Sequence, residues 1–140
     1  MQLELVDIAL RGHELVMDDD FLPALVDDWS DYTMETKAGV VSWKLLPKEG
    51  DKTLVRFVVT AGLRWRAEVD DPSTVATIEA EYGMLFAAPD GFDSAAHDTE
   101  VGRQVVLAAW PYWRQDFLQM ASKASLPLVA IPTNPYQDED

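Results

Sequence analysis

The apolar residues of this 140-residue chain change their spacing once. Over roughly the first 86 residues, apolar and polar positions tend to alternate, which is typical of strands with one face toward a core. Later the apolar residues recur about every 3.6 positions, which is typical of a helix. Several extended segments followed by one helix predict an α+β fold, in which the helix packs on an antiparallel sheet.

Four segments carry the alternating pattern: residues 3–15, 32–46, 53–69 and 74–86. The turn-forming sequence Pro-Lys-Glu-Gly-Asp at 47–51 separates the second from the third, so we expect a long hairpin there. Asp-Asp-Pro-Ser at 70–73 predicts the next turn. In the third segment, the alternation predicts one packed and one partly solvated sheet face. The order of the segments predicts an antiparallel meander, with a bulge or bend at Gly83 where the alternation breaks.

One apolar helical stripe follows the strands. Its large residues are Val106, Trp110, Trp113, Phe117 and Met120. Pro111 lies within the stripe and predicts a kink or a restart, because proline removes a backbone hydrogen bond. The stripe fits either the core or a subunit interface, and it exceeds what a four-stranded sheet must cover. We therefore expect a homodimer or tetramer that uses this stripe. Residues 1–140 form a single domain, with an acidic tail at 133–140.

Charge and composition restrict the partners. The chain has 25 acidic and 11 basic residues, so its formal net charge is −14. Such a chain repels nucleic acid and anionic membranes, whereas it suits high solubility or a partner with basic segments. The sequence has no run of about 18 apolar residues and no signal-peptide pattern at its start, so we expect a cytoplasmic protein.

The sequence lacks the usual signs of an enzyme or a metal site. Cysteine is absent, which excludes disulfides and thiolate ligands. His13 and His97 are the only histidines, and Ser42, Ser73 and Ser94 lack a nucleophile motif. The acidic run at 18–20 is not followed by the glycine and bidentate glutamate of a calcium loop. We expect no catalysis, no metal and no cofactor.

The aromatic residues are the informative set, because five tryptophans are more than one small core needs. The segment between the first two strands carries Phe21, Leu22, Leu25 and Trp29, and acidic residues flank it. These side chains either pin a loop to the sheet or form a groove that accepts many apolar sequences. Trp43 and Trp65, on the hairpin strands, are further candidates for the same groove.

Three segments, taken in order, resemble the SecB family of chaperones. Residues 110–114, Trp-Pro-Tyr-Trp-Arg, resemble the family's helix motif built on Phe-Pro-Tyr-Ala-Arg, with matching apolar residues before and after it. Residues 126–132, Leu-Pro-Leu-Val-Ala-Ile-Pro, resemble its exit from that helix. Residues 77–86 resemble its fourth strand, including an acid, a glycine and a closing phenylalanine.

The resemblance implies a four-stranded antiparallel sheet with a long helix, assembled as a dimer of dimers. It also implies apolar grooves that hold unfolded polypeptides without ATP. Export-type members pass these clients to the motor SecA, and relatives in toxin–antitoxin systems protect an antitoxin. The chain is therefore expected to be a holdase chaperone, either general or dedicated to one client.

This chain departs from the export type in ways that weaken the link to SecA. Eight residues follow Pro132, so we expect the family's second C-terminal helix to be absent. The acids of the first strand align with Gly12 and Val16, while Glu14 and Asp18 lie out of that alignment. Glu79 matches the fourth-strand acid, and with Glu81 it is the candidate acidic face for a partner. We expect SecA contact to be marginal.

An alternative is an assembly or adaptor subunit with the same fold that binds one folded partner. Such a subunit would leave unrelated unfolded proteins unaffected, whereas a holdase would slow their aggregation.

Overall fold

The computed structural model describes residues 2–47, 50, 53–68, 73–92 and 98–136. The two turns predicted at 47–51 and 70–73 lie partly outside these residues. Ser94, His97 and the last four residues of the predicted acidic tail also lie outside them.

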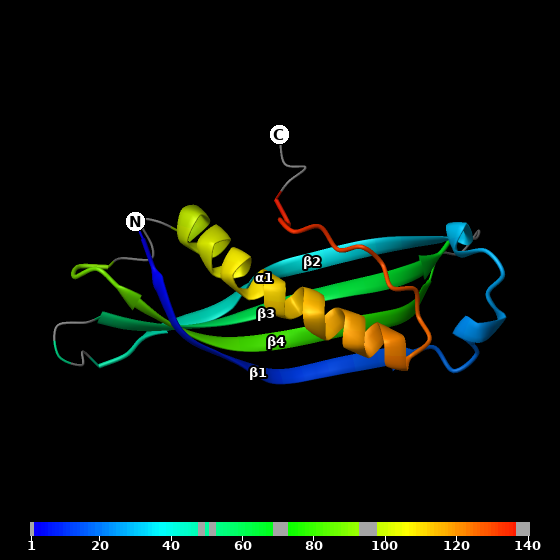
Figure 1. The fold of residues 1–140 in the computed structure, drawn as a ribbon, viewed down its shortest axis with the longest axis horizontal. Coiled ribbons are helices and arrows are strands. Elements are labelled where there is room, and N and C mark those ends of the chain that lie inside the picture. The colour runs from blue at the N-terminus through cyan, green and yellow to red at the C-terminus, as the bar shows by residue number, and fades with distance from the viewer. Residues whose placement is uncertain (1, 48–49, 51–52, 69–72, 93–97, 137–140) are drawn as a thin grey trace.

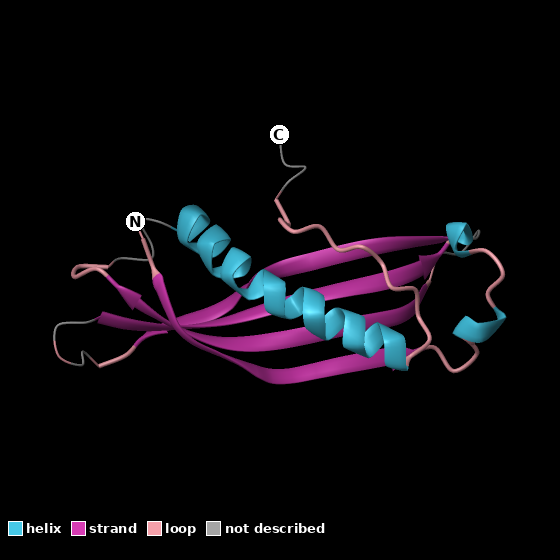
Figure 2. Cartoon of the chain, in the orientation of Figure 1, coloured by secondary structure: helices cyan, strands magenta, loops and turns pink. Residues whose placement is uncertain are grey.

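Among the described residues, one sheet and one long helix make up the fold (Figure 1). The strands are β1 (Glu4–Met17), β2 (Tyr32–Leu45), β3 (Thr53–Ala67) and β4 (Thr74–Ala88), and the helix is α1 (Asp98–Lys123). Two short 3₁₀ turns, η1 (Pro23–Leu25) and η2 (Trp29–Asp31), lie between β1 and β2. The helix runs obliquely across one face of the sheet, and no helix in the described part of the chain lies on the other face (Figure 2). The predicted α+β fold is confirmed.

The strand order is β1-β4-β3-β2, and every neighbouring pair is antiparallel. Strands β2, β3 and β4 form the predicted hairpin and meander. The prediction of a simple four-stranded meander is wrong for β1, which pairs with β4 instead of β2. Alternation within a strand identifies its buried face but carries no information about its neighbour, so this pairing was not accessible from the pattern.

The bulge expected at Gly83 lies on the neighbouring strand. Gly83 pairs in regular register with Val58, whereas the register between β1 and β4 shifts between Leu10 and Gly12. A Cβ atom at Gly83 would lie 3.0 Å from the Cδ of Arg11. The glycine therefore leaves room for the side chain of the bulged arginine, and its own strand stays regular.

The core lies between the sheet and α1. Alternate residues of β3 and β4 point to the helix and are buried, among them Phe57, Trp65, Ile78 and Met84. The Trp65 ring stacks on Phe117, with centroids 6.1 Å apart, and Phe117 also contacts Trp113 at 5.7 Å. The opposite residues of these strands include Arg56, Arg64 and Glu79, so the two faces are unequal, as predicted.

The helical stripe is part of this core. Val106, Trp110, Trp113 and Phe117 are at most 3% exposed within one chain, and Met120 packs against the same cluster. These side chains have almost no surface left to offer a second subunit. The stripe is therefore the intrachain core instead of the subunit interface that the sequence indicated, because the helix lies directly over the two central strands.

The helix continues through Pro111 as one element of 26 residues. The predicted restart at this proline therefore does not occur. No helix within the described ranges is long and apolar enough to cross a membrane.

A polar contact lies at the edge of the apolar core. The Tyr82 hydroxyl donates a hydrogen bond to Oδ2 of Asp116, at 2.5 Å, and so links β4 to α1. The pKa of Tyr82 is raised well above its ordinary value, chiefly by burial and also by the bond to the Asp116 carboxylate. Tyr82 therefore stays a neutral donor throughout the physiological pH range.

Removal of this hydroxyl in Tyr82→Phe is expected to lower the free energy of unfolding by about 1–2 kcal/mol, because the Asp116 carboxylate loses its donor in a partly buried site. Urea denaturation measures the change. Tyr112→Phe is the matched control, since Tyr112 is 44% exposed. It should change stability by less than about 0.5 kcal/mol. Equal effects of the two substitutions would contradict a structural role for the Tyr82 bond.

Candidate functional site

The segment between β1 and β2, residues 18–31, crosses one end of the sheet and is called the crossover loop. It is anchored at both ends. The Asp18 N–H donates to the Val75 carbonyl at 2.9 Å, and the Glu68 N–H donates to the Asp31 carbonyl at 2.9 Å. Pro23 begins the 3₁₀ turn η1, and the Asp28 carboxylate caps η2 by accepting from the Ser30 N–H. These bonds hold an irregular segment in a defined place.

Three rings fix the loop to the end of the sheet. Phe21, Trp29 and Tyr32 contact one another with centroid separations of 5.3 to 6.0 Å. All three are half-buried and pack against the core. Phe21 and Trp29 therefore pin the loop, which is one of the two roles that their sequence positions allowed.

Leu22 and Leu25 remain in solvent. They are 57% and 73% exposed, although both are large aliphatic residues. With Phe21, Val26 and Tyr32 they line a groove of about 520 Å³. The groove thus has an apolar floor that the loop's own packing leaves uncovered, which is characteristic of a surface for a partner.

Acidic residues surround this groove. The acidic residues that line it are Asp20, Asp27, Asp28, Asp31 and Glu68. Hydrogen bonds from the Ser30 side chain and its N–H lower the pKa of Asp28, so that this carboxylate is ionised at neutral pH. Four of the five acids come from the loop itself. Glu68 follows β3 and reaches the groove only because the chain folds back, so the loop sequence gave no sign of it.

Trp43 and Trp65 do not belong to the groove. Trp65 is 1% exposed and lies in the core on the helix side of β3. Trp43 is 46% exposed, but it pairs with Phe57 at the hairpin end of β2. Eleven residues of strand separate it from Tyr32, which corresponds to about 36 Å. A client-binding role for Trp65 is excluded by its burial, and Trp43 is a separate exposed residue.

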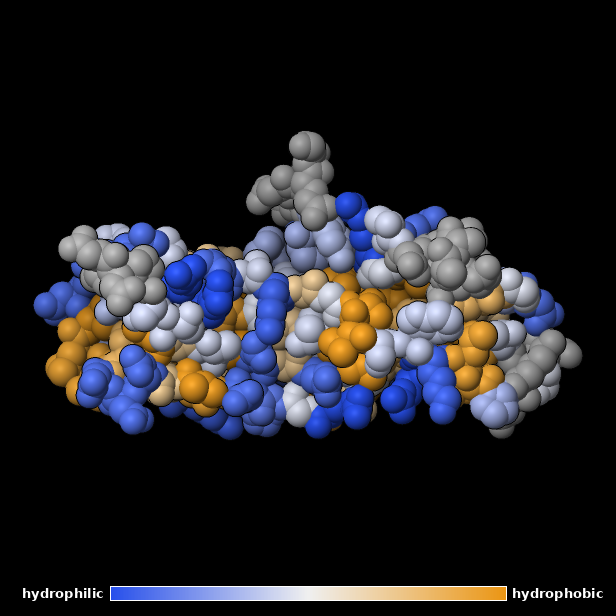
Figure 3. Space-filling view, turned by 180° about the vertical axis from the view of Figure 1, so that it is seen from behind, coloured by the Kyte–Doolittle hydropathy of each residue, from blue (hydrophilic) through white to orange (hydrophobic). Residues whose placement is uncertain are grey.

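The candidate acidic face lies on the side of the sheet away from α1, which we call the open face. Figure 3 shows this side of the molecule, with hydrophilic residues (blue) along much of its length and hydrophobic residues (orange) between them. The Nζ of Lys37 lies 2.6 Å from Oε1 of Glu79, so the ion pair joins β2 to β4 across β3. A Cβ at Gly62, on β3 between them, would lie 3.1 Å from both side chains. The missing side chain of Gly62 therefore makes room for the pair.

Glu14 joins the same face. It pairs in register with Glu79, and Gly12 and Val16 pair with Glu81 and Thr77 on either side. The sequence alignment placed acids of the first strand at Gly12 and Val16 and treated Glu14 as out of register. In the structure all three positions share the open face, because they are two residues apart.

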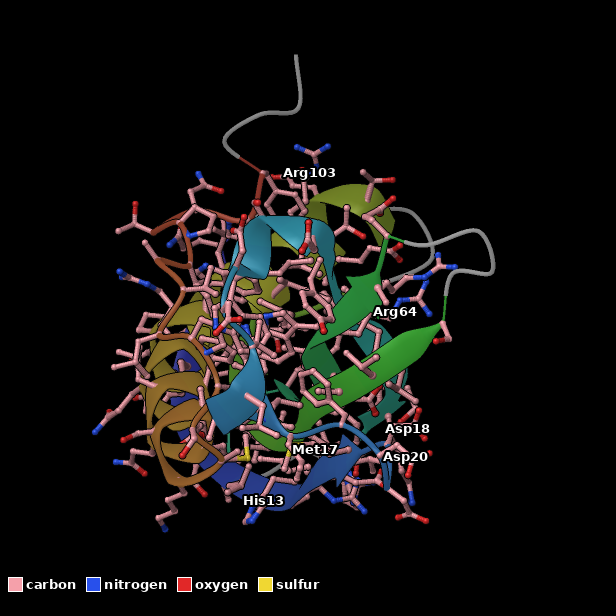
Figure 4. All side chains as sticks on the ribbon, turned by 90° about the vertical axis from the view of Figure 1, so that its right-hand side faces the viewer. His13, Met17, Asp18, Asp20, Arg64 and Arg103 are labelled. Carbon is pink, nitrogen blue, oxygen red and sulfur yellow. The ribbon has the colours of Figure 1, made fainter. Side chains whose placement is uncertain are left out.

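A second ionic cluster lies on β2 and β3. Arg64 and Arg66 both donate to the Glu35 carboxylate; Arg66 Nη1 lies 3.0 Å from Oε1. Figure 4 shows Arg64 on the side of the sheet opposite α1. The hydrogen bond from Arg64, and then that from Arg66, lowers the pKa of Glu35.

The polar candidates that the structure describes lie apart from one another. His13 lies on β1, whereas Ser42 lies on β2 at the opposite edge of the sheet. Asp18 and Asp20 lie at the start of the crossover loop and point outward (Figure 4). Within the described ranges, no group of three histidine, aspartate or glutamate residues is arranged to hold a metal ion.

No protein-family model and no curated protein sequence matches this chain. Its fold does match a solved structure, that of the SecB-like chaperone Rv1957 of Mycobacterium tuberculosis in complex with a ChAD peptide from the HigA1 antitoxin Rv1956. The TM-score is 0.63 over 93% of this chain and 88% of that chain, at 18% sequence identity. The chain therefore has a SecB-like fold.

Glu35→Gln should lower the melting temperature near neutral pH, because it removes the negative charge and one of the two oxygens that accept from the arginines. Because the pKa of Glu35 is lower in the folded protein than the unfolded value of 4.5, its ionised carboxylate stabilises the fold at pH values above 4.5. This stabilisation is lost as the pH falls through the lowered pKa of the folded protein. The difference in melting temperature between wild type and variant should therefore be present at about pH 7 and should shrink as the pH falls below 4.5.

Glu81→Gln is the control for this titration. This substitution removes a carboxylate from the same face of the sheet. Among the described residues, the Glu81 carboxylate has no arginine partner. At about pH 7 it should lower the melting temperature less than Glu35→Gln does. A difference for Glu35→Gln that does not change with pH would show that the arginine bonds contribute nothing.

Proposed function

We propose that this protein is a chaperone that holds non-native or extended polypeptide in the groove of the crossover loop, without ATP. The observation that carries the proposal is the exposure of Leu22 and Leu25 over a groove whose aromatic floor is fixed. A SecB-like fold at low identity supports it. The solved protein of similar fold is in complex with an antitoxin peptide, and a dedicated client of that kind is part of the proposal for this chain.

The geometry of the groove suits polypeptide better than a small molecule. The groove is open, and its floor offers rings and aliphatic side chains instead of several convergent hydrogen-bonding groups. Apolar contact of this kind accepts many sequences, because it fixes no hydrogen-bond pattern. The acidic rim favours segments that carry lysine or arginine beside their apolar residues, since opposite charge accelerates encounter.

We further propose a homo-oligomer, with an interface different from the stripe predicted by the sequence. The outer surface of α1 carries Leu107 and Leu118, which are 38% and 45% exposed. They are eleven residues apart, or about three helical turns, so they lie on one side of the helix. A second copy that packs on this side would cover both.

Replacement of Leu22 and Leu25 by serine is expected to weaken client binding by at least about ten-fold, because each buried leucine contributes about 1.5–3 kcal/mol. The assay is light scattering of a denatured model protein with and without the chaperone. Phe21 and Trp29 stay unchanged, so the loop remains pinned. Circular dichroism and melting temperature should therefore match wild type.

Val6→Ser is the matched control for this assay, since Val6 is 54% exposed near the opposite end of β1. It should hold clients as well as wild type does. A wild-type protein with no effect on any unfolded protein would support the adaptor subunit instead. A double variant with full activity would place the client elsewhere.

Sedimentation at micromolar concentration is expected to show a species larger than the 15.7 kDa chain. Leu107→Glu with Leu118→Glu should shift it to the monomer, because two buried like charges would oppose each other across a symmetric contact. Glu81→Gln, on the open face, should leave the mass unchanged. A wild-type monomer at this concentration would refute the oligomer.

A further inference from the structure

The chain after α1 turns back and runs along the helix. Ser125 adopts a left-handed backbone, with φ of 58°, and the Leu126 N–H donates to the Ala121 carbonyl at 2.9 Å. These features form a helix-ending turn of the Schellman type. Residues 126–136, which we call the strap, then lie beside α1 as far as the level of Arg103 (Figures 1 and 4).

The strap is bound as an extended peptide. Its odd-numbered residues Val129 and Ile131 face inward, and Ile131 is 6% exposed, whereas Leu128 is 61% exposed. Ten residues in an extended proline-rich conformation span about 31 Å, and α1 spans about 27 Å between Arg103 and Ala121. The strap therefore follows the helix over nearly that whole length.

Side chains of α1 hold the main chain of the strap. Trp110 Nε1–H donates to the Pro132 carbonyl at 2.6 Å, and Arg114 Nε–H donates to the Ile131 carbonyl at 3.1 Å. At the far end, the Arg103 guanidinium lies 4.9 Å from the centre of the Tyr136 ring. Trp110 and Arg114 donate to main-chain carbonyl groups, which every polypeptide has. Their recognition of an extended segment is therefore tolerant of its sequence.

Hydrogen bonds from one main-chain group to another contribute little to the attachment of the strap to α1. Among the described residues, the main chain of 127–135 has only one main-chain hydrogen bond, which is internal to the strap, from Val129 N–H to the Pro127 carbonyl. Beside the strap there remains a hollow of about 410 Å³, lined by Pro111 and Leu118 of α1 and by Leu128 of the strap. The strap is thus attached through a few side chains next to a surface that it covers incompletely.

We propose that the side of α1 beneath the strap is a second polypeptide-binding site, whose ligand is an extended segment with aliphatic side chains two residues apart. The strap is its resident occupant, and an incoming segment replaces it by accepting from Trp110 and Arg114. The proposal rests on the proposed function in one respect, which is that a client supplies the incoming segment.

The test uses the full chain and an acetylated, amidated peptide with the sequence of residues 126–136. Ile131→Ser removes the main buried side chain of the strap and should free the site. Calorimetry is expected to show the peptide binding to this variant at least about ten-fold more tightly than to wild type. Leu128→Ser, at an exposed position of the same strap, is the matched control and should behave as wild type. A peptide with serine in place of Ile131 should not bind.

Two results would overturn the proposal. One is a folded Ile131→Ser protein, judged by circular dichroism, that binds the peptide no better than wild type, which would make the strap only structural. The other is equal binding by wild type and both variants, which would place the peptide elsewhere. If Ile131→Ser does not fold, Ile131→Ala takes its place, with a smaller gain expected and the same refuting outcomes.

Peptide binding measured by calorimetry is independent of the chaperone assay. Peptide binding to Ile131→Ser should persist when Leu22 and Leu25 are also replaced by serine, because the crossover loop does not hold the strap. Loss of client holding in the Leu22 and Leu25 variant, with no peptide bound by Ile131→Ser, would retain the proposed function and refute the strap site alone.

Discussion

The packing of Phe117 of α1 on Trp65 of β3, with Trp113 against Phe117, determines which side of the sheet becomes the core. Each of these side chains contributes about 1.5–3 kcal/mol on burial, which is large beside a net stability of about 5–15 kcal/mol for a domain. One helix is about 10 Å wide, whereas four strands span about 19 Å. The helix covers the central strands and leaves apolar residues of the edge strands exposed, including Leu10 and Met34. The exposed apolar surface of these edge strands is a consequence of that mismatch.

The local sequence pattern was sufficient to predict the strands and the helix, but it was insufficient to predict which of them lie next to each other. The alternation and the turn sequence predicted the hairpin of β2 and β3, the unequal faces and the long helix, because these depend on residues close in sequence. The partner of β1 depends on the path of the crossover loop, which no periodicity encodes. Likewise, an apolar stripe on a helix shows that something covers it, but not whether this is the chain's own sheet or a second copy. For Trp110 and Trp113 it is the chain itself, and the strap takes part in covering Trp110.

The candidate site illustrates the same limit. Phe21, Leu22, Leu25 and Trp29 were found because large apolar residues in an acidic loop are unusual, and the structure divides them into two that pin the loop and two that stay exposed. Trp65 was misassigned because composition counts tryptophans without regard to the face of the strand. Glu68 was missed because it joins the groove through a fold contact between β3 and the loop. Abundance and position identify candidates, whereas only the register and the path of the chain bring them together.

The proposed chaperone role requires a surface that stays apolar without binding the same surface of another copy, and two physically different features of this chain would meet that requirement. At the crossover loop, Leu22 and Leu25 stay in water beneath a rim of carboxylates, and the net charge of −14 makes two such grooves repel each other. Repulsion acts over about 8–10 Å at ordinary salt, so it protects an exposed site without closing it. Along α1, charge is of less use, because Trp110 and Ile131 lie close to the core. There the chain covers its own apolar surface with a strap that is held by side chains instead of a strand ladder. Under the proposed function, the first arrangement would leave the groove open to cationic segments at all times. Under the proposed strap site, the second would open only to a ligand that matches an extended chain well enough to displace one.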